Sequence, residues 1–353
     1  MTVHPYRLGF AVKVLGGGGL KTSDTRRWQS GPHLRRSLEL LGPVLEYLDA
    51  IDVRMFRLSS STVPYGTHPD LPELDYRRQI ESCAAELEAL GARARALGIR
   101  LSTHPGQYTV VNAPDPELAR KALLDLEQDA LLLDALGAGP EATVVVHVGG
   151  AYGDRASALD RWAGAYGRLS ERARRRVAVE HDERLFSLDD VLELHRRTGV
   201  RTVFDLHHHR LNGNGMGTAD AFAAAFGTWP AGVRPKAHLS TPRSELRVVR
   251  RGGRDVLVPP RLEQHADFVS PWDAAELVRA APGPFDLMLE AKAKDVALLA
   301  LRAQLERLAP EVSAGEERTV SGRRATVEPF DEGPDRRPRS PARHARARGE
   351  RVR

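Results

Sequence analysis

Six residues with acidic or imidazole side chains stand at the ends of short apolar runs, one residue to each run. They are His104, His147, Glu180, Asp205, His238 and Glu290. Parallel strands that are buried on both faces have this apolar character, and their carboxyl ends lie on one side of the sheet. Histidine and carboxylate groups together are common ligands of borderline and hard divalent metals. The pattern therefore predicts a metalloenzyme.

The number of such residues favours a shared metal site over a coincidence of unrelated polar residues. A single histidine at a strand end is most often a hydrogen-bonded polar group of the fold, but six on successive runs would each need a separate explanation. Further donors stand in the segments DLHHH (205–209) and HADF (265–268), which is enough for more than one metal. Sites with several metals suit phosphodiester hydrolysis, because one ion generates hydroxide while others stabilise the attacking and leaving oxygens.

The string HPGQY at residues 104–108 directly follows an apolar run. Pro105 and Gly106 favour a sharp turn, so Gln107 and Tyr108 are expected at the rim of the site. An amide and an aromatic ring at a loop tip could enter a base stack, where the ring replaces a lost stacking partner. The alternative is an ordinary turn with a surface tyrosine, which would be favoured if the string stood alone.

The apolar runs alternate with helical stretches, and eight strand–helix units fit before residue 310. Strands are expected at 7–14, 53–59, 99–103, 142–147, 176–180, 201–205, 235–239 and 284–290, and helices at 34–48, 76–97, 116–136, 156–172, 219–226 and up to about 308. Eight such units are typical of a (β/α)8 TIM barrel. We predict an α/β protein with one barrel domain over residues 1–310 and an active site at its carboxyl-terminal mouth.

One long connection, residues 243–261, lies between the seventh strand and the next helix. Two β-favouring runs flank Gly252-Gly253, which is a hairpin signal. Six arginines against Glu245 and Asp255 give this segment a charge of +4. It is either a solvated hairpin whose charges prevent sheet aggregation, or a basic arm that grips phosphates. In the second case Arg247, Arg250 and Arg251 are expected to contact DNA.

The net charge of +5 is concentrated at the end of the chain. Residues 336–353 contain eight arginines and one glutamate, and removing this +7 leaves −2 for residues 1–335. The Arg/Pro-rich composition predicts disorder for residues 311–353, with a general role in binding polyanions left open.

Membrane and secretory signals are missing from the sequence. No apolar run approaches the length of a membrane span, and no secretory leader pattern is seen. The single cysteine, Cys83, excludes an internal disulfide and a zinc site built on several thiolates, and we interpret it as core filler in a helix. These features favour a cytoplasmic protein, associated with the nucleoid if it binds DNA, with no membrane partner.

The motifs together resemble the UV damage endonuclease (UvdE) family. THPGQY, VVVHVGG, VAVEHDE, FDLHHHRLN, PKAHLS, QHADF and LMLEAKAKD occur in the family's order, and the resemblance covers roughly residues 7–305. It implies a TIM barrel with up to three divalent ions, manganese favoured. It also implies incision of damaged double-stranded DNA immediately 5′ of a UV photoproduct. A monomer with no obligate protein partner is favoured.

The resemblance also implies roles for individual residues. The implied metal ligands are His104, His147, Glu180, Asp205, His208, His238, His265 and Glu290. Glu180, Asp205 and Glu290 are expected to act in catalysis. Lys236 is expected to act with them, at the position of a lysine that can be carboxylated beside the cluster. Gln107 and Tyr108 match the pair that probes the damaged duplex.

The chain departs from the family at the end of the first strand. Where the family usually has a tyrosine and, four residues on, an asparagine, this chain has Phe10 and Val14. Phe10 keeps a ring that can stack on a base but lacks the hydroxyl, and Val14 has no hydrogen-bonding group. Phe10 is therefore expected among the lesion contacts, and the range of lesions is left open.

The expected reaction is metal-assisted hydrolysis that leaves a 3′-hydroxyl and a 5′-phosphate. An abasic-site endonuclease on a related barrel would share the ligand types. A xylose-isomerase-like sugar isomerase needs metal sites rich in Glu and Asp and a small closed pocket, so the additional histidines and the basic rim count against it. A non-catalytic DNA-binding descendant would require lost ligands, and all eight are present.

Overall fold

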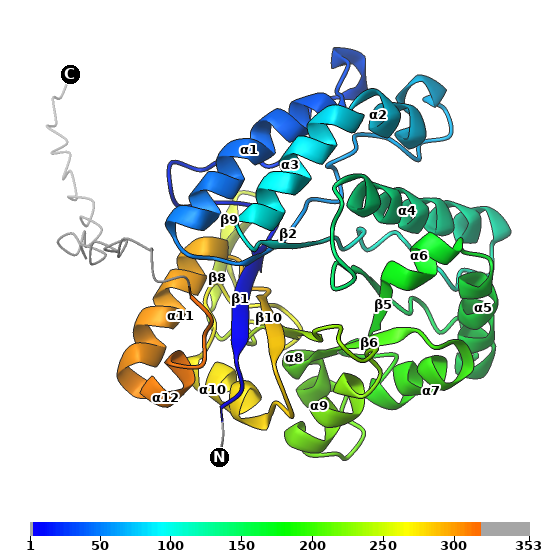
Figure 1. Ribbon diagram of the computed structural model, residues 1–353. Helices are drawn as coiled ribbons and strands as arrows, with labels where there is room; N and C mark the ends of the chain where they lie inside the picture. Colours follow the sequence, from blue (N-terminus) through cyan, green and yellow to red (C-terminus); the bar gives the residue numbers. More distant parts are fainter. Residues whose placement is uncertain (1–2, 319–353) are drawn as a thin grey trace, which may run out of the picture.

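The structure is a computed structural model, and it describes residues 3–318 (Figure 1). Eight parallel strands form one sheet in the order β3-β2-β1-β10-β7-β6-β5-β4. The strands are β1 (Tyr6–Ala11), β2 (Met55–Arg57), β3 (Arg100–Ser102), β4 (Val144–His147), β5 (Val177–Glu180), β6 (Arg201–Asp205), β7 (Lys236–Leu239) and β10 (Phe285–Leu289). Each overlaps an expected apolar run, and most are shorter than expected.

The two edge strands of this sheet, β3 and β4, meet through Thr103. The Thr103 N–H donates to the Thr143 carbonyl at 2.9 Å, and the Val145 N–H donates to the Thr103 carbonyl at 3.0 Å. A parallel bridge joins Thr103 to Val144 at the same place. The sheet therefore closes into a barrel, and the predicted TIM-barrel architecture is confirmed.

Helices surround the barrel (Figure 1). They are α1 (Leu34–Ala50), α2 (Tyr76–Ser82), α3 (Ala84–Ala96), α4 (Pro116–Ala135), α5 (Arg155–Gly167), α6 (Glu171–Arg176), α7 (Leu188–Thr198), α8 (Leu206–Leu211), α9 (Thr218–Phe226), α10 (Pro271–Ala280), α11 (Lys294–Leu308) and α12 (Pro310–Ser313). The leucines of α1 that recur every three or four residues are all buried, because they face the strands.

Two of the expected helices are each divided into two. The helix expected over 76–97 breaks at Cys83, which is fully buried and free, as expected for core filler. The helix expected over 156–172 ends at Gly167, and a second helix, α6, begins after Ser170. The Ser170 hydroxyl accepts a hydrogen bond from the Ala173 N–H at 3.2 Å, which is a standard N-terminal cap.

The basic connection forms the predicted hairpin. Strand β8 (Arg247–Arg251) pairs antiparallel with β9 (Arg254–Val258), separate from the barrel sheet. The turn residues Gly252 and Gly253 both have positive φ, 55° and 77°. A two-residue hairpin turn requires this conformation at both central positions, which explains the glycine pair.

The packed body continues beyond the expected boundary at residue 310. The Tyr6 N–H donates to the Gly315 carbonyl at 3.0 Å, and the buried Glu316 pairs with Arg302. Residues up to Glu317 therefore pack on the barrel, because this segment completes the hydrogen bonds of β1. The rest of the tail, predicted to be disordered, lies outside the described residues. Within residues 3–318, no helix has the length and apolar character needed to cross a membrane.

Candidate active site

The carboxylate of Glu180, at the end of β5, is the centre of a cluster at the mouth of the barrel. Its Oε1 lies 2.9 Å from His238 Nδ1. Its Oε2 lies 3.4 Å from His104 Nε2 and 3.7 Å from His147 Nε2. Strands β3, β4, β5 and β7 thus deliver one side chain each to a single point, because their carboxyl ends share one rim.

Glu290, just after β10, extends the cluster. Its Oε1 lies 3.3 Å from His238 Nδ1, and its Oε2 lies 3.8 Å from His265 Nδ1. His208, on the short helix α8, places Nδ1 3.5 Å from Glu180 Oε1. Asp205, at the end of β6, groups with Glu180 and His238 so that one potential ligand atom of each lies within 4.8 Å of the others. The structure therefore brings all eight expected ligands into one cluster.

Several buried atoms of this cluster have no hydrogen-bond partner in the described part of the chain. They are Glu180 Oε2, Asp205 Oδ2, His238 Nε2 and His147 Nδ1. A buried polar atom left unpaired costs about 1–3 kcal/mol. The donor chemistry fits a divalent cation, which would satisfy such carboxylate and imidazole atoms together. Two groups have the spacing needed to hold an ion, one of His104, His147 and Glu180, the other of Glu180, Asp205 and His238.

Backbone carbonyls orient three of the histidines. His104 Nδ1 lies 3.0 Å from the Pro105 carbonyl, and His208 Nδ1 lies 3.0 Å from the His181 carbonyl. His265 Nδ1 lies 3.0 Å from the Glu290 carbonyl. A carbonyl only accepts, so a neutral ring donates its Nδ1 proton there and keeps the Nε2 lone pair available. Metal-binding histidines are commonly oriented in this way.

The electrostatics of the cluster keep its carboxylates ionised. Burial by itself would raise the pKa of Glu180, but His238 and His147 hold it well below its ordinary value. Burial would likewise raise the pKa of Glu290, but Arg57 and His238 hold it well below its ordinary value. Ionised carboxylates are the form that binds metal.

The pKa values of two histidines in the cluster shift in opposite directions. Burial lowers the pKa of His147, which favours the neutral, metal-binding ring. Burial acts in the same direction on His208, but the carboxylates of Asp205 and Glu180 raise the pKa of His208 to about 9. An ion that binds His208 must therefore displace a proton, which makes binding dependent on pH.

Lys236 lies inside the barrel, two residues before His238 on β7. Its side chain is fully buried, and Nζ lies 3.1 Å from Ser102 Oγ. Burial, with Arg57 and Arg100 nearby, lowers its pKa well below the ordinary value. This shift favours the neutral, nucleophilic form of the amine.

The loop that follows β3 carries Gln107 and Tyr108 into solvent. Tyr108 is 87% exposed, and Gln107 is exposed as well. Thr109 Oγ1 donates to Asp125 Oδ2 at 2.9 Å, which fastens the base of this loop to α4. The tip therefore projects from a fixed base, as expected from the string HPGQY.

The expectation that Phe10 contacts a lesion is not met by the structure. Phe10 is fully buried in the core between the strands and the helices, edge-on to Phe56 with ring centroids 5.4 Å apart. Side chains alternate along a strand, and on β1 it is Ala11 that packs inside the barrel, with Met55 and Met288. Val14 is also buried. Phe10 thus offers no exposed ring face to a base.

Residues overlooked in the sequence also belong to the cluster. Arg57, on β2, forms an ion pair with Glu290, and Glu183 Oε2 lies 3.9 Å from His208 Nε2. His207 is buried with neither ring nitrogen paired within residues 3–318, and its ring lies 5.4 Å from that of His265. A charged residue inside a short buried strand was the available signal for Arg57. For Glu183 the available signal was the run EHDE, which begins at the last residue of β5.

The fold and this cluster agree with a comparison to known protein families. The family described as UV-endonuclease UvdE matches residues 35–316. Because that match covers most of the chain, the protein belongs to the UV-endonuclease UvdE family.

Individual relatives carry the same description. The UV DNA damage endonuclease of Bacillus cereus (strain G9842) is 30% identical over 278 residues, covering 77% of this chain and 81% of that protein. That of Bacillus pumilus (strain SAFR-032) is 32% identical over 261 residues, covering 72% and 75%. The crystal structure of SacUVDE matches with a TM-score of 0.71 at 26% identity, covering 85% of this chain and 98% of that one. Family and fold together support a UV-damage repair endonuclease.

Proposed function

We propose that this protein is a metal-dependent endonuclease that cuts damaged double-stranded DNA. The cut falls directly 5′ of UV photoproducts, pyrimidine dimers and 6-4 photoproducts, and leaves a 3′-hydroxyl and a 5′-phosphate. The observation that carries the proposal is the set of buried, unpaired carboxylate and imidazole atoms at the barrel mouth of a UvdE-family chain. Such atoms are costly to a fold and useful to a metal site.

In this proposal the eight clustered residues hold the ions. They are His104, His147, Glu180, Asp205, His208, His238, His265 and Glu290. Divalent ions, with Mn²⁺ favoured and up to three bound, would supply hydroxide near neutral pH and neutralise charge on the phosphodiester. Arg57 orients the Glu290 carboxylate through their ion pair. Glu180, Asp205, Glu290 and Lys236 are the residues proposed to touch the reacting groups.

The exposed loop tip is proposed to detect the damage. Gln107 and Tyr108 would enter the duplex where photoproducts have weakened stacking and pairing. Unstacking costs a few kcal/mol per step, and less at a damaged step. Selectivity then follows from how easily the duplex deforms, without reading base edges.

The hairpin β8–β9 is proposed to hold the DNA backbone. Arg247, Arg250 and Arg251 are exposed on it, and the hairpin follows the carboxyl end of β7, on the side of the cluster. Contacts of this kind carry no sequence information and weaken steeply with salt.

The test is a nicking assay on supercoiled plasmid with protein stripped by a chelator and reloaded with manganese. Irradiated plasmid should be nicked and intact plasmid should not, and the stripped protein should be inactive until reloaded. Equal nicking of both plasmids would reject damage specificity. Nicking of a plasmid with abasic sites, but not of an irradiated one, would favour the abasic-site endonuclease. Full activity in the stripped protein would reject the role of metal.

A further inference from the structure

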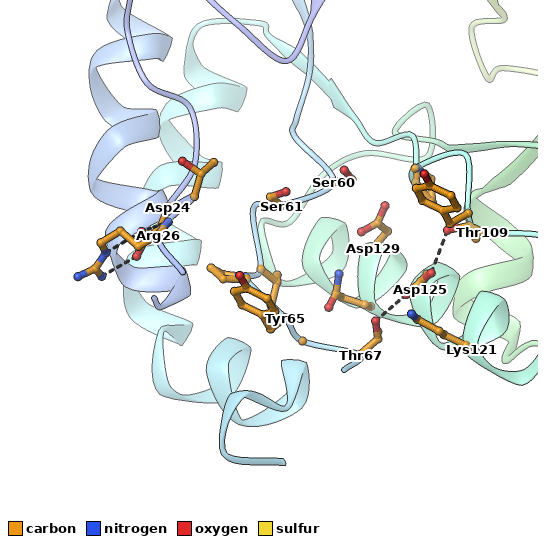
Figure 2. A pocket seen from close by; sticks show the side chains of 18 residues that line it. Asp24, Arg26, Ser60, Ser61, Tyr65, Thr67, Thr109, Lys121, Asp125 and Asp129 are labelled. Carbon is orange, nitrogen blue, oxygen red and sulfur yellow. Dashed lines mark hydrogen bonds and ion pairs between the residues drawn. The ribbon is translucent and has the colours of Figure 1, made fainter. Parts of the chain in front are cut away.

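Two of the cavities in the described chain lie at opposite ends of the barrel. One is a polar cleft between α4, the loop after β2, the segment 24–26 and residues 105–109, where Asp125 accepts hydrogen bonds from Thr67 and Thr109 (Figure 2). It borders the damage-probing loop. The other, of about 370 Å³, is lined by residues at or before the starts of strands β4, β5, β6 and β7. Parallel strands begin at one end of a barrel, so this amino-terminal cavity faces away from the metal cluster.

Arg201, the first residue of β6, lines the amino-terminal cavity and is 5% exposed. Its guanidinium lies over the ring of Trp229, 5.2 Å from the ring centroid. Its Nη1 donates to the Pro140 carbonyl at 3.0 Å, and its Nη2 donates to the Arg175 carbonyl. These contacts fix the position of the guanidinium. They do not neutralise its charge, because the ring and both carbonyls are uncharged.

The other buried arginines of the described chain each pair with a carboxylate. The pairs are Arg54 with Asp49, Arg100 with Asp286, Arg176 with Asp134, Arg243 with Asp267, and Arg302 with Glu316. Arg201 has no such ion pair within residues 3–318, and burial, with Arg100 and Arg176 nearby, lowers its pKa to about 10. It is still charged at neutral pH. A buried charge is costly unless it is paired, so an anion from outside would stabilise it.

The charge around the amino-terminal cavity is positive. Three consecutive arginines, residues 174–176, border it beside Arg201. The one carboxylate of the lining, Asp134, lies 2.6 Å from Arg176 Nε and 2.9 Å from Arg172 Nε. Four arginines against this aspartate leave a local charge of +3, which attracts an anion.

The groups that line the cavity indicate the chemistry of its ligand. A guanidinium matches the oxygens of a phosphate or a carboxylate. Pro140, Pro230 and Val233 add apolar surface to the lining. The volume of about 370 Å³ is enough for a small molecule. The lining therefore suits a compact anion that carries one such group on an apolar body.

We propose that the amino-terminal cavity binds a small organic anion, whose phosphate or carboxylate group is the counter-ion of Arg201. The inference does not rest on the proposed function, because the cavity and the metal cluster lie at opposite ends of the barrel. The anion stabilises the folded protein, and the free energy of unfolding rises with its concentration.

The test measures the binding of phenyl phosphate, benzoate and phenol to the manganese-loaded protein by calorimetry. The first two present the two anionic groups on the same ring, and phenol has the ring without the charge. One of the two anions should bind, phenol should not, and the tighter anion identifies the group. Arg201→Met keeps the length of the side chain and removes its charge. It should weaken binding of that anion at least about tenfold, the effect of one hydrogen bond to a charged group. Arg307→Met, an exposed position on α11, should leave binding unchanged.

A matched pair of variants keeps the result interpretable if Arg201→Met unfolds. Pro230 is an exposed position in the wall of the cavity. Pro230→Glu adds a tethered carboxylate and should weaken anion binding at least about tenfold, whereas Pro230→Gln, of the same size and uncharged, should bind as the wild type does. Anion binding that neither Arg201→Met nor Pro230→Glu weakens would overturn the proposal. So would equal binding of phenol, no binding of either anion at millimolar concentration, or binding that disappears when manganese is removed.

Discussion

The two ends of the barrel treat buried carboxylates in opposite ways. At the amino-terminal end, Asp286 on β10 is fully buried and pairs with three arginines. Its Oδ2 lies 2.7 Å from both Arg7 Nη2 and Arg100 Nη1, and its Oδ1 lies 3.0 Å from Arg234 Nε. At the mouth, Glu180 is equally buried, but it faces imidazoles, and its Oε2 has no hydrogen-bond partner in the described chain.

The difference separates a structural ion network from a binding site. Burial alone would raise the pKa of both carboxyls, and in both the surroundings lower the pKa instead. Both Asp286 oxygens have arginine partners within the protein, which leaves this carboxylate with nothing to gain from a ligand. At Glu180, the atom Oε2 has no hydrogen-bond partner among the described residues, and a bound ion could supply the missing interaction. Chemistry is therefore expected at the mouth and only stability at the opposite end.

The largest effect is expected for Glu180→Ala. Incision of irradiated plasmid should fall at least about a thousandfold, because the metal-assisted step is worth several kcal/mol. The metal-free protein should fold, with a loss of about 1–3 kcal/mol in the free energy of unfolding, because the buried His238 loses its Glu180 partner. Glu88→Ala, an exposed position on α3, is the matched control. Retained activity in Glu180→Ala would remove it from the ligands.

Asp286→Ala should have the reverse effect. It leaves three arginines facing one another without their anion, and breaking a buried ion network in this way costs about 3–5 kcal/mol. Urea denaturation should show this loss in the free energy of unfolding, while manganese binding measured by calorimetry stays intact. A variant that folds normally but no longer binds manganese would contradict the division between the two ends.

Asp129 on α4 is another buried carboxylate, and its effect on stability should depend on pH. Burial, against hydrogen bonding from Thr103 and with Asp125 nearby, raises its pKa to about 7. Its pKa in the folded protein exceeds that in the unfolded chain, so its stabilising effect is complete below about pH 4 and is lost as pH rises through 7. Relative to Asp129→Asn, the wild type should lose up to about 4 kcal/mol of unfolding free energy across that range. Parallel stability curves for the two proteins would contradict the shift.

The smallest effect is expected at the hairpin, where charge is exposed. Arg250→Gln should reduce DNA affinity uniformly across sequences and lower the slope of log affinity against log salt by about one. Arg307→Gln on α11 is exposed in the same way, lies away from the hairpin, and should leave the slope unchanged. An unaltered slope in Arg250→Gln would leave the hairpin as a solvated ribbon.

Much of the barrel could be predicted because its signals are local and repeated. Each strand is a short apolar run, and six of the eight runs end in a residue such as Glu180 or Asp205 that is out of place in a core. Parallel strands carry those ends to one rim whatever the details of packing. The hairpin was equally local, since Gly252-Gly253 fixes its turn.

The remaining features depend on contacts that spacing does not encode. Phe10 faces the helices and not the barrel mouth because a side chain's direction changes with each residue of a strand. Glu183 joins the cluster through its approach to His208, and the run EHDE does not specify this contact between two separate segments. The cleft is assembled from segments as distant as Arg26, Tyr65 and Gln128, so none of them marks it alone.

The closure of the barrel at Thr103 has a consequence for the cluster above it. In the part of the chain that the structure describes, the backbone hydrogen bonds that connect β3 to β4 all involve Thr103. His104 and His147 lie on either side of this connection. An ion bound by both imidazoles would link the end of β3 to the end of β4, where the barrel closes. Metal binding and stabilisation of the closed barrel would then be coupled. DNA that exerts force on the loop tip at Gln107 and Tyr108 would act on both.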